Sequence, residues 1–229
     1  MQKIKSYIID SYRFMTGLGL AVALTACAGQ TPDDWGESDG GQIMSDLRVP
    51  TRLGVIPSSP DSTGSFARAT VRATREGIES EAILPVVGGH IEVQTIDGAL
   101  LVINDVVVEF IDVPIDAAAL PPRGLTLTGI GLHLTTPTAI EASHVGSRVT
   151  AIAAFDLVAE WSVDLGDGGV YALRAIPLRG IPVSIELERD AFGTITGRLV
   201  ALGDGVFWSW ANLFELADLT LDLSVVAAI

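Results

Sequence analysis

Alternation of apolar and polar residues dominates the second half of the chain. In residues 150–165 every odd position from Ala151 to Leu165 is apolar, and the even positions include four polar residues, Asp156, Glu160, Ser162 and Asp164. A period of two residues is typical of a β-strand with one buried face. The pattern therefore predicts a long strand at Thr150–Leu165 whose odd face lines the main core.

Similar stretches precede it from about residue 86. Asp97-Gly98 separates His90–Ile96 from Ala99–Val113, and this dipeptide is a strong hairpin signal. The run Ala99–Val113 is apolar on both faces, which predicts a strand covered on both sides. In Leu125–Leu134 the alternation slips by one residue at Gly129, which predicts a β-bulge there.

The C-terminal part continues in the same way. Further strands are predicted at Val170–Ile176, Val183–Arg189, Thr194–Leu202 and Leu219–Val225. Turns are predicted at 166–169, 190–193 and 203–205, which are rich in Gly and Asp. Pro177 and Pro182 interrupt strand pairing and so indicate an edge or a corner. The stretch 206–216 is ambiguous, since Leu213–Ala217 also fits one or two helical turns.

Residues 65–82 favour a helix. Ser65 can cap it, and Arg72 stands four residues before Glu76, a spacing that brings opposite charges together on a helix. The alternative is a strand with inward-facing Ala67, Ala69, Val71 and Ala73. Antiparallel strands joined by short turns then predict a mainly β fold: a single antiparallel sandwich or a curved, partial-barrel domain over 48–229, with this one N-terminal helix.

The N-terminal segment has the three parts of an export signal. Lys3, Lys5 and Arg13 precede the apolar stretch Phe14–Ala23, which is shorter than the roughly 20 residues that a membrane-spanning helix needs. It ends in Leu24-Thr25-Ala26-Cys27, which contains the only cysteine of the chain. An ordinary secretory signal with an incidental cysteine is the alternative.

The sequence Leu24-Thr25-Ala26-Cys27 resembles the lipobox of bacterial lipoproteins. The resemblance implies that residues 1–26 are a signal peptide, cut off before Cys27, and that Cys27 is acylated with diacylglycerol and a further fatty acid such as palmitate. Ala28, where retained lipoproteins carry Asp, implies a lipid-anchored location in the cell envelope at the outer membrane of a Gram-negative bacterium. Residues 27–47 then form the acylated cysteine and an acidic, disordered tether, because they contain little that can be buried.

Charge and composition narrow the choice of partners. Removal of residues 1–26 leaves 11 arginines, no lysine and 27 acidic residues, a net charge of −16. Such acidity disfavours nucleic acid and anionic lipid surfaces as partners. No thiol other than that of Cys27 is present for a disulfide or a zinc–thiolate site. The mean hydropathy of +0.45 is high, so the domain either has a large dry interior or presents apolar surface to something.

No catalytic constellation emerges from the polar residues. The three histidines, His90, His133 and His144, lack metal-ligand spacing, and Ser209 has no activating neighbour. Acidic pairs such as Asp156 and Glu160 alternate as a solvated strand face does. We therefore expect no enzyme activity, no cofactor and no metal.

Two functions remain, and they belong to different classes. The first is a non-enzymatic binding module for a lipid or other apolar ligand, whose ligand face comprises Phe155, Leu157, Trp161, Trp208 and Trp210. In outline such a carrier resembles the LolB-like and BPI-like envelope families. The second is a structural or assembly lipoprotein that docks on another envelope protein. A carrier needs one deep apolar cavity, whereas a docking module has a filled core and an exposed apolar patch.

Overall fold

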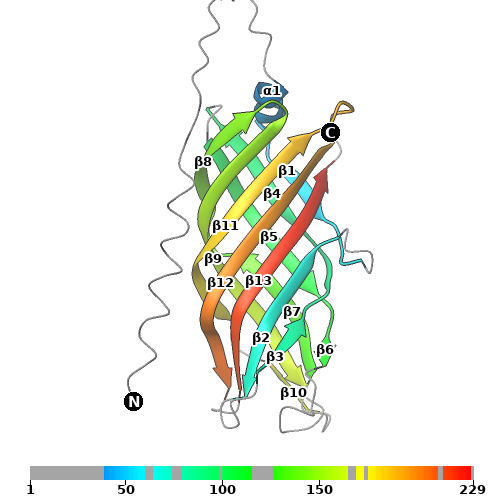
Figure 1. The fold of residues 1–229 in the computed structure, drawn as a ribbon, viewed down its shortest axis with the longest axis vertical. Helices are drawn as coiled ribbons and strands as arrows, with labels where there is room; N and C mark the ends of the chain where they lie inside the picture. The colour runs from blue at the N-terminus through cyan, green and yellow to red at the C-terminus, as the bar shows by residue number, and fades with distance from the viewer. Residues whose placement is uncertain are drawn as a thin grey trace, which may run out of the picture. The chain divides into compact units, whose positions relative to one another are not determined.

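The computed structural model describes residues 39–59, 64–73, 79–97, 100–114, 126–164, 169–172, 175–210 and 214–227, so Cys27 and the expected signal peptide lie outside the described residues. Residues 37–229 form one compact unit. Its elements are α1 (Asp39–Asp46), β1 (Thr51–Val55), β2 (Phe66–Ala73), β3 (Glu79–Ile83), β4 (Val86–Ile96), β5 (Leu100–Phe110), β6 (Val113–Pro114), β7 (Thr126–Leu134), β8 (Thr138–Val145), β9 (Arg148–Asp164), β10 (Val170–Ala172), β11 (Ile176–Arg189), β12 (Ile195–Trp210) and β13 (Phe214–Ala227) (Figure 1).

Eight of these strands close into an antiparallel barrel. Their order is β1-β4-β5-β7-β9-β11-β12-β13, and β13 pairs back to β1 through Gly54 opposite Val226. The remaining strands extend the wall: β2 and β3 continue it from β13, β8 pairs with β5 and β9, and β6 and β10 are short additions. The expected mainly β class is confirmed, and the sheet closes as a barrel rather than stacking as a sandwich.

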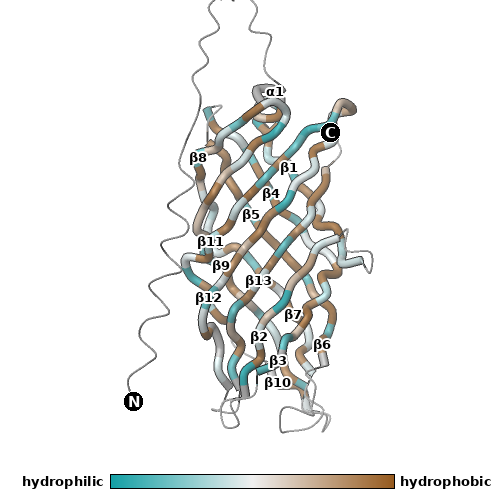
Figure 2. Tube along the Cα trace, viewed as in Figure 1, coloured by the Kyte–Doolittle hydropathy of each residue, from teal (hydrophilic) through white to brown (hydrophobic). Residues whose placement is uncertain are grey.

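The strand β9 carries the largest part of the core. The inward set, which comprises Val149, Ala151, Phe155, Leu157, Ala159, Trp161 and Val163, is buried. On the other face Asp156 and Glu160 are exposed, and so is Ile152. Figure 2 shows the resulting alternation of hydrophobic and hydrophilic residues along the strands. The predicted odd-face burial is thus confirmed over the described part of Thr150–Leu165.

The strand β5 is covered on its outer side only in part, so the prediction of a strand covered on both sides holds only around Val102, which is buried. Asp105 pairs with Glu92 and Ile103 pairs with Val93, which leaves Asn104 as an extra residue in a bulge. The bulge shifts the phase of the strand by one residue. Leu101 and Ile103 face inward before it, and Val106, Val108 and Phe110 face inward after it. Most residues of the two apolar faces in the sequence thus lie on one inner face.

The helix expected at 65–82 is also wrong, and its strand alternative is confirmed by the buried Ala67, Ala69 and Val71 of β2. Arg72, which suggested helical spacing to Glu76, pairs across the hairpin with Glu79 instead, and Arg68 pairs across it with Glu81. Arg72 Nε lies 2.6 Å from Glu79 Oε1, and Arg68 Nη1 lies 3.4 Å from Glu81 Oε1. The spacing of the small alanines fits the period of a helix as well as that of a strand, and the cross-strand ion pairs favour the strand.

Three local predictions are confirmed. Gly129, with a φ of 58°, lies in a bulge where β7 shifts its register against β9 between Thr128 and Gly131. Asp97, with a φ of 55°, begins the turn between β4 and β5. In the turn between β11 and β12, Asp190 Oδ1 accepts hydrogen bonds from the amides of Phe192 and Thr194, both at 2.8 Å.

Two other turn predictions need correction. The stretch 203–205 is not a turn: β12 runs through it, and the register against β13 shifts between Gly203 and Val206. The described part of Leu213–Ala217 is strand, because β13 begins at Phe214. The β11 prolines do mark a corner, since β11 pairs with β9 there with a register shift between Leu178 and Ile181.

The helix α1 replaces the last part of the predicted tether. Ile43, Met44 and Leu47 are buried at one end of the barrel, where α1 packs against β8 and β9. The backbone amide of Thr95 donates to Leu47 O at 2.7 Å, and the Thr95 hydroxyl donates to Met44 O at 2.5 Å. The prediction of a disordered tether is therefore wrong over 39–47, because these three apolar side chains close the core.

An ion pair fixes the same helix from the outside. Asp46 Oδ2 lies 2.5 Å from Arg189 Nε, at the C-terminal end of β11, and both side chains are mostly buried. Opposite charges enclosed in this way interact more strongly than a fully exposed pair. The helix is therefore held to β4 by hydrogen bonds and to β11 by charge.

We predict that Leu47→Ala destabilises the protein by about 2–5 kcal/mol, because it opens a cavity at a fully buried position. Ser45→Ala, two residues earlier on the exposed side of α1, should change stability by less than about 0.5 kcal/mol. Urea unfolding of both variants measures the difference. Equal, small effects would show that α1 is not part of the cooperative core.

Candidate functional site

Three of the five residues predicted to form an apolar ligand face lie inside the barrel. Phe155, Leu157 and Trp161 project from β9 into the core, with exposed fractions of 1%, 3% and 6%. The side chains of the other two, Trp208 and Trp210, lie outside the described residues. The described part of the predicted face is thus a core surface rather than an open platform.

One small cavity remains in this core. It measures about 30 Å³, and its lining is wholly apolar: Ala69, Ala82, Leu84, Phe110, Leu127, Ile130, Leu132, Ala159, Trp161, Leu178, Leu216 and Leu219. About 10–15 Å³ measured in this way holds one water molecule, so the space suits roughly two. A fatty acyl chain does not fit without moving the core.

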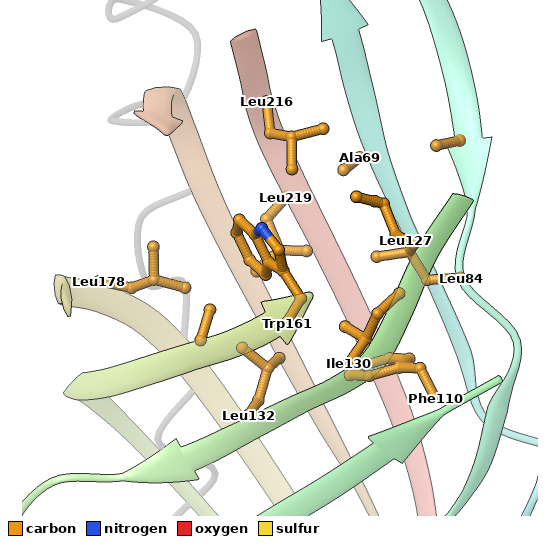
Figure 3. Close-up of a pocket in the computed structure, with 12 residues that line it drawn as sticks. Ala69, Leu84, Phe110, Leu127, Ile130, Leu132, Trp161, Leu178, Leu216 and Leu219 are labelled. Carbon is orange, nitrogen blue, oxygen red and sulfur yellow. The ribbon is translucent and has the colours of Figure 1, made fainter. Parts of the chain in front are cut away.

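The barrel is narrow enough for its own side chains to fill it. Eight strands leave an interior that side chains can occupy completely or that can hold one small ligand. Figure 3 shows side chains from different walls, among them Trp161 of β9 and Leu219 of β13, meeting across the interior. The indole of Trp161 fills the space that would hold the ligand in a lipid carrier.

A much larger hollow lies on the outside of the barrel wall. This surface groove has a volume of about 630 Å³ and is lined by Ser58, Ser59, Gly64, Ser65, Phe66, Ala67, Ile83, Leu84, Pro85 and Asp222. It lies where the chain leaves β1 and returns as β2. No pattern in the sequence predicts it, because its walls come from the 58–65 segment, β2, the connection between β3 and β4, and β13, which the fold brings together.

Serine hydroxyls fix the floor of the surface groove. Ser58 Oγ donates to Ser65 O at 2.7 Å and accepts from the Val86 amide at 2.9 Å. Ser65 Oγ, which is buried, donates to Ser224 O at 3.3 Å and accepts from the Ser224 amide at 3.1 Å. These bonds join the 58–65 segment to β4 and β13, so the floor is held from two sides.

Exposed apolar side chains form the rim of the surface groove. Ile83 and Phe66 lie in its wall with exposed fractions of 60% and 39%. Two large apolar side chains thus stand partly exposed in the wall of this groove.

Charged pairs surround this rim. Arg68 lies over the Phe66 ring, 5.8 Å from its centroid, and pairs with Glu81. Arg198 forms a two-point hydrogen bond with Asp222 on the neighbouring wall. That hydrogen bond and the charge of Asp222 raise the pKa of the Arg198 guanidinium, so it stays charged at every physiological pH. The rim is therefore apolar at its centre and ionic at its edge.

The polar residues weighed for catalysis do not converge. His90 is held by Arg52 at 2.7 Å and by Asp105 at 3.1 Å, while His133 and His144 belong to β7 and β8. In the described part of the chain no three His, Cys, Asp or Glu side chains are grouped as metal ligands.

The acidic pairs are engaged elsewhere. Asp156 Oδ1 accepts the Gly180 amide at 2.8 Å, which supports the β11 corner. Glu186 and Glu188 both pair with Arg148. The predicted Gly-rich turn at 166–169 lies almost wholly outside the described residues. No helix in the described ranges has the length and apolar character needed to cross a bilayer.

We predict that Trp161→Ala converts the small cavity into a binding site for a benzene-sized molecule. Apolar cavities of about 150 Å³ stay dry and bind such molecules, and the truncation should cost about 3–5 kcal/mol of stability. Calorimetry with benzene on the variant, on Trp161→Phe and on the wild type tests this. Stoichiometric uptake of a fluorescent fatty acid by the wild type would contradict a filled interior.

Comparison of the sequence with models of known protein families finds no match. A search of curated proteins finds no significant relative. The function must therefore be argued from the geometry of the barrel and its surface.

Proposed function

We propose that this protein is a lipid-anchored lipoprotein of the cell envelope whose barrel is a non-enzymatic docking module for another envelope protein. The observation that carries the choice is the contrast between a core cavity of about 30 Å³ and a surface groove of about 630 Å³. Recognition then takes place on the wall of the barrel, not inside it.

The anchor is supported by the sequence Leu24-Thr25-Ala26-Cys27. Asp39, the first residue of α1, lies twelve residues after Cys27. A fully extended segment of that length spans at most about 40 Å, so acylated Cys27 would hold the barrel close to the bilayer. Several acyl chains anchor a protein stably, whereas a single chain does so only reversibly. The outer membrane of a Gram-negative bacterium is the location that Ala28 favours.

A lipid carrier is the weaker proposal. It requires Phe155, Leu157 and Trp161 to line an open cavity, and all three are packed in the core. Uptake of an acyl chain would have to displace these side chains, and the free-energy cost would be comparable to that of disrupting the packed core. The docking proposal needs no such rearrangement.

The surface groove suits a protein partner in two respects. Its hydrogen-bonded floor pre-organises the surface, which lowers the entropic cost of binding. In the described residues β3 pairs only with β2, so its other edge can accept an added strand beside Ile83. The net charge of −16 on the processed chain favours a partner with a basic surface.

The anchor predicts that Cys27→Ser removes the protein from the membrane pellet, because no thiol is left to acylate. Cell fractionation measures this, and mass spectrometry of the wild type should find an acylated N-terminal cysteine. A mutant that still has its cysteine, such as Thr25→Ala, is the matched control. An unacylated mature N-terminus would overturn the anchor.

The docking surface predicts a position-specific crosslink. A photoreactive phenylalanine analogue at Ile83, in the wall of the surface groove, should give one discrete crosslinked species in intact cells. The same analogue at Ile152, which is more exposed at 81% but lies on β9, should not. Equal crosslinking from positions 83 and 152 would count against docking at the surface groove. So would a crosslink from position 83 to lipid in place of protein.

A further inference from the structure

Four apolar side chains project from connections at the end of the barrel that α1 closes, which we term the plug end. They are Val49, Ile96, Val145 and Phe192, with exposed fractions of 69%, 43%, 82% and 93%. Each belongs to a different connection: Val49 follows α1, Ile96 ends β4, Val145 ends β8, and Phe192 lies in the turn after β11.

We call these four side chains the tips, and a hydrogen bond places two of them, Phe192 and Val145, on adjacent turns. The Arg189 amide donates to Ser147 O at 3.1 Å, which joins the turn that carries Phe192 to the turn that carries Val145. The ion pair of Arg189 with Asp46 joins both turns to α1.

The other two tips meet the same helix. The Thr95 amide donates to Leu47 O, so Ile96 and Val49 each stand within two residues of that bond. Gln94 Nε2 also donates to Arg48 O at 3.2 Å. The four tips therefore lie around one rim, with α1 among them (Figure 1).

We propose that the plug end rests on a phospholipid bilayer, with Val49, Ile96, Val145 and Phe192 inserted into its interfacial region. The proposal rests on the proposed lipid anchor, because that anchor brings this end of the barrel to the bilayer. The acyl chains would hold the protein at the bilayer, and the four apolar side chains would fix the orientation of the barrel there.

The position of the chain's entry favours a lipid surface over a protein partner. The residues that precede Asp39 join the barrel at the plug end, and Cys27 lies twelve residues before it. A partner protein would compete for a surface that the anchor already holds within about 40 Å of the bilayer. Separate apolar tips on four connections also suit a fluid surface, which fills the spaces between them.

The charges at the plug end permit this contact. The Asp190 carboxylate is occupied by the amides of its own turn, and Asp46 is paired with Arg189. Arg48 is exposed beside Val49, where a guanidinium can reach lipid phosphates. Because Asp97 adjoins Ile96 and the chain is acidic overall, the contact should not require anionic lipid.

A tethered-chain experiment tests insertion separately from acylation. The full chain with Cys27→Ser is held on phosphatidylcholine vesicles by an N-terminal histidine tag and nickel-chelating lipid. Phe192→Cys or Val145→Cys then supplies the only thiol, which is labelled with an NBD fluorophore. Val170→Cys is the matched control, since Val170 is 63% exposed and lies in β10, at the end away from α1.

The expected result is a blue shift of NBD emission at positions 192 and 145, with several-fold stronger quenching by spin-labelled lipid than at position 170. Adding Val49→Ser and Ile96→Ser to the Phe192→Cys chain should reduce both effects, whereas proximity from the tether alone would leave them unchanged. Water-like emission at 192 and 145, or no effect of the serine substitutions, overturns the proposal whatever mass spectrometry finds at Cys27.

Discussion

The space inside a closed eight-stranded barrel is the constraint on which the rest of this molecule depends. Once β13 pairs with β1, the inward positions of all eight strands share one narrow interior. Gly197 illustrates how tightly it is filled: a Cβ there would lie 2.5 Å from Leu187 Cδ2 and 2.7 Å from Glu186 O. Leu187 and Val225 are accommodated because the position between them on β12 carries Gly.

Closure of the wall leaves the two ends to be sealed by other means. At the plug end α1 and the residue after it supply Ile43, Met44 and Leu47; Thr95 donates hydrogen bonds to the carbonyls of Met44 and Leu47, and Arg189 forms an ion pair with Asp46. Residues 39–47 are acidic in composition and yet form part of the fold, because they bury three apolar side chains. Composition alone does not predict this burial.

Period-two alternation made nearly all of β9 and half of β11 and β13 predictable, because the inner face of a barrel strand is as regular as that of a sheet. Prediction failed where one residue changes the phase. Asn104 brings most of the two apolar faces of β5 onto one, and the bulge after Gly203 looks like a turn in sequence. Closure itself could not be predicted, since it joins Gly54 to Val226, which are far apart in the chain.

The same constraint explains why the predicted ligand face and the candidate site differ. Phe155, Leu157 and Trp161 were identified because they are large and apolar on one face, which is also what a filled core requires. The surface groove depends instead on the serine contacts that hold the chain between β1 and β2, and single hydroxyls leave no pattern in a sequence. With the interior occupied and the outer wall carrying ion pairs such as Arg148 with Glu186, specific recognition is confined to features that break the regular wall. The surface groove beside β3 and the plug end around α1 are two such features, and they lie on different parts of the molecule: one on the side of the barrel, and the other at the end that α1 closes.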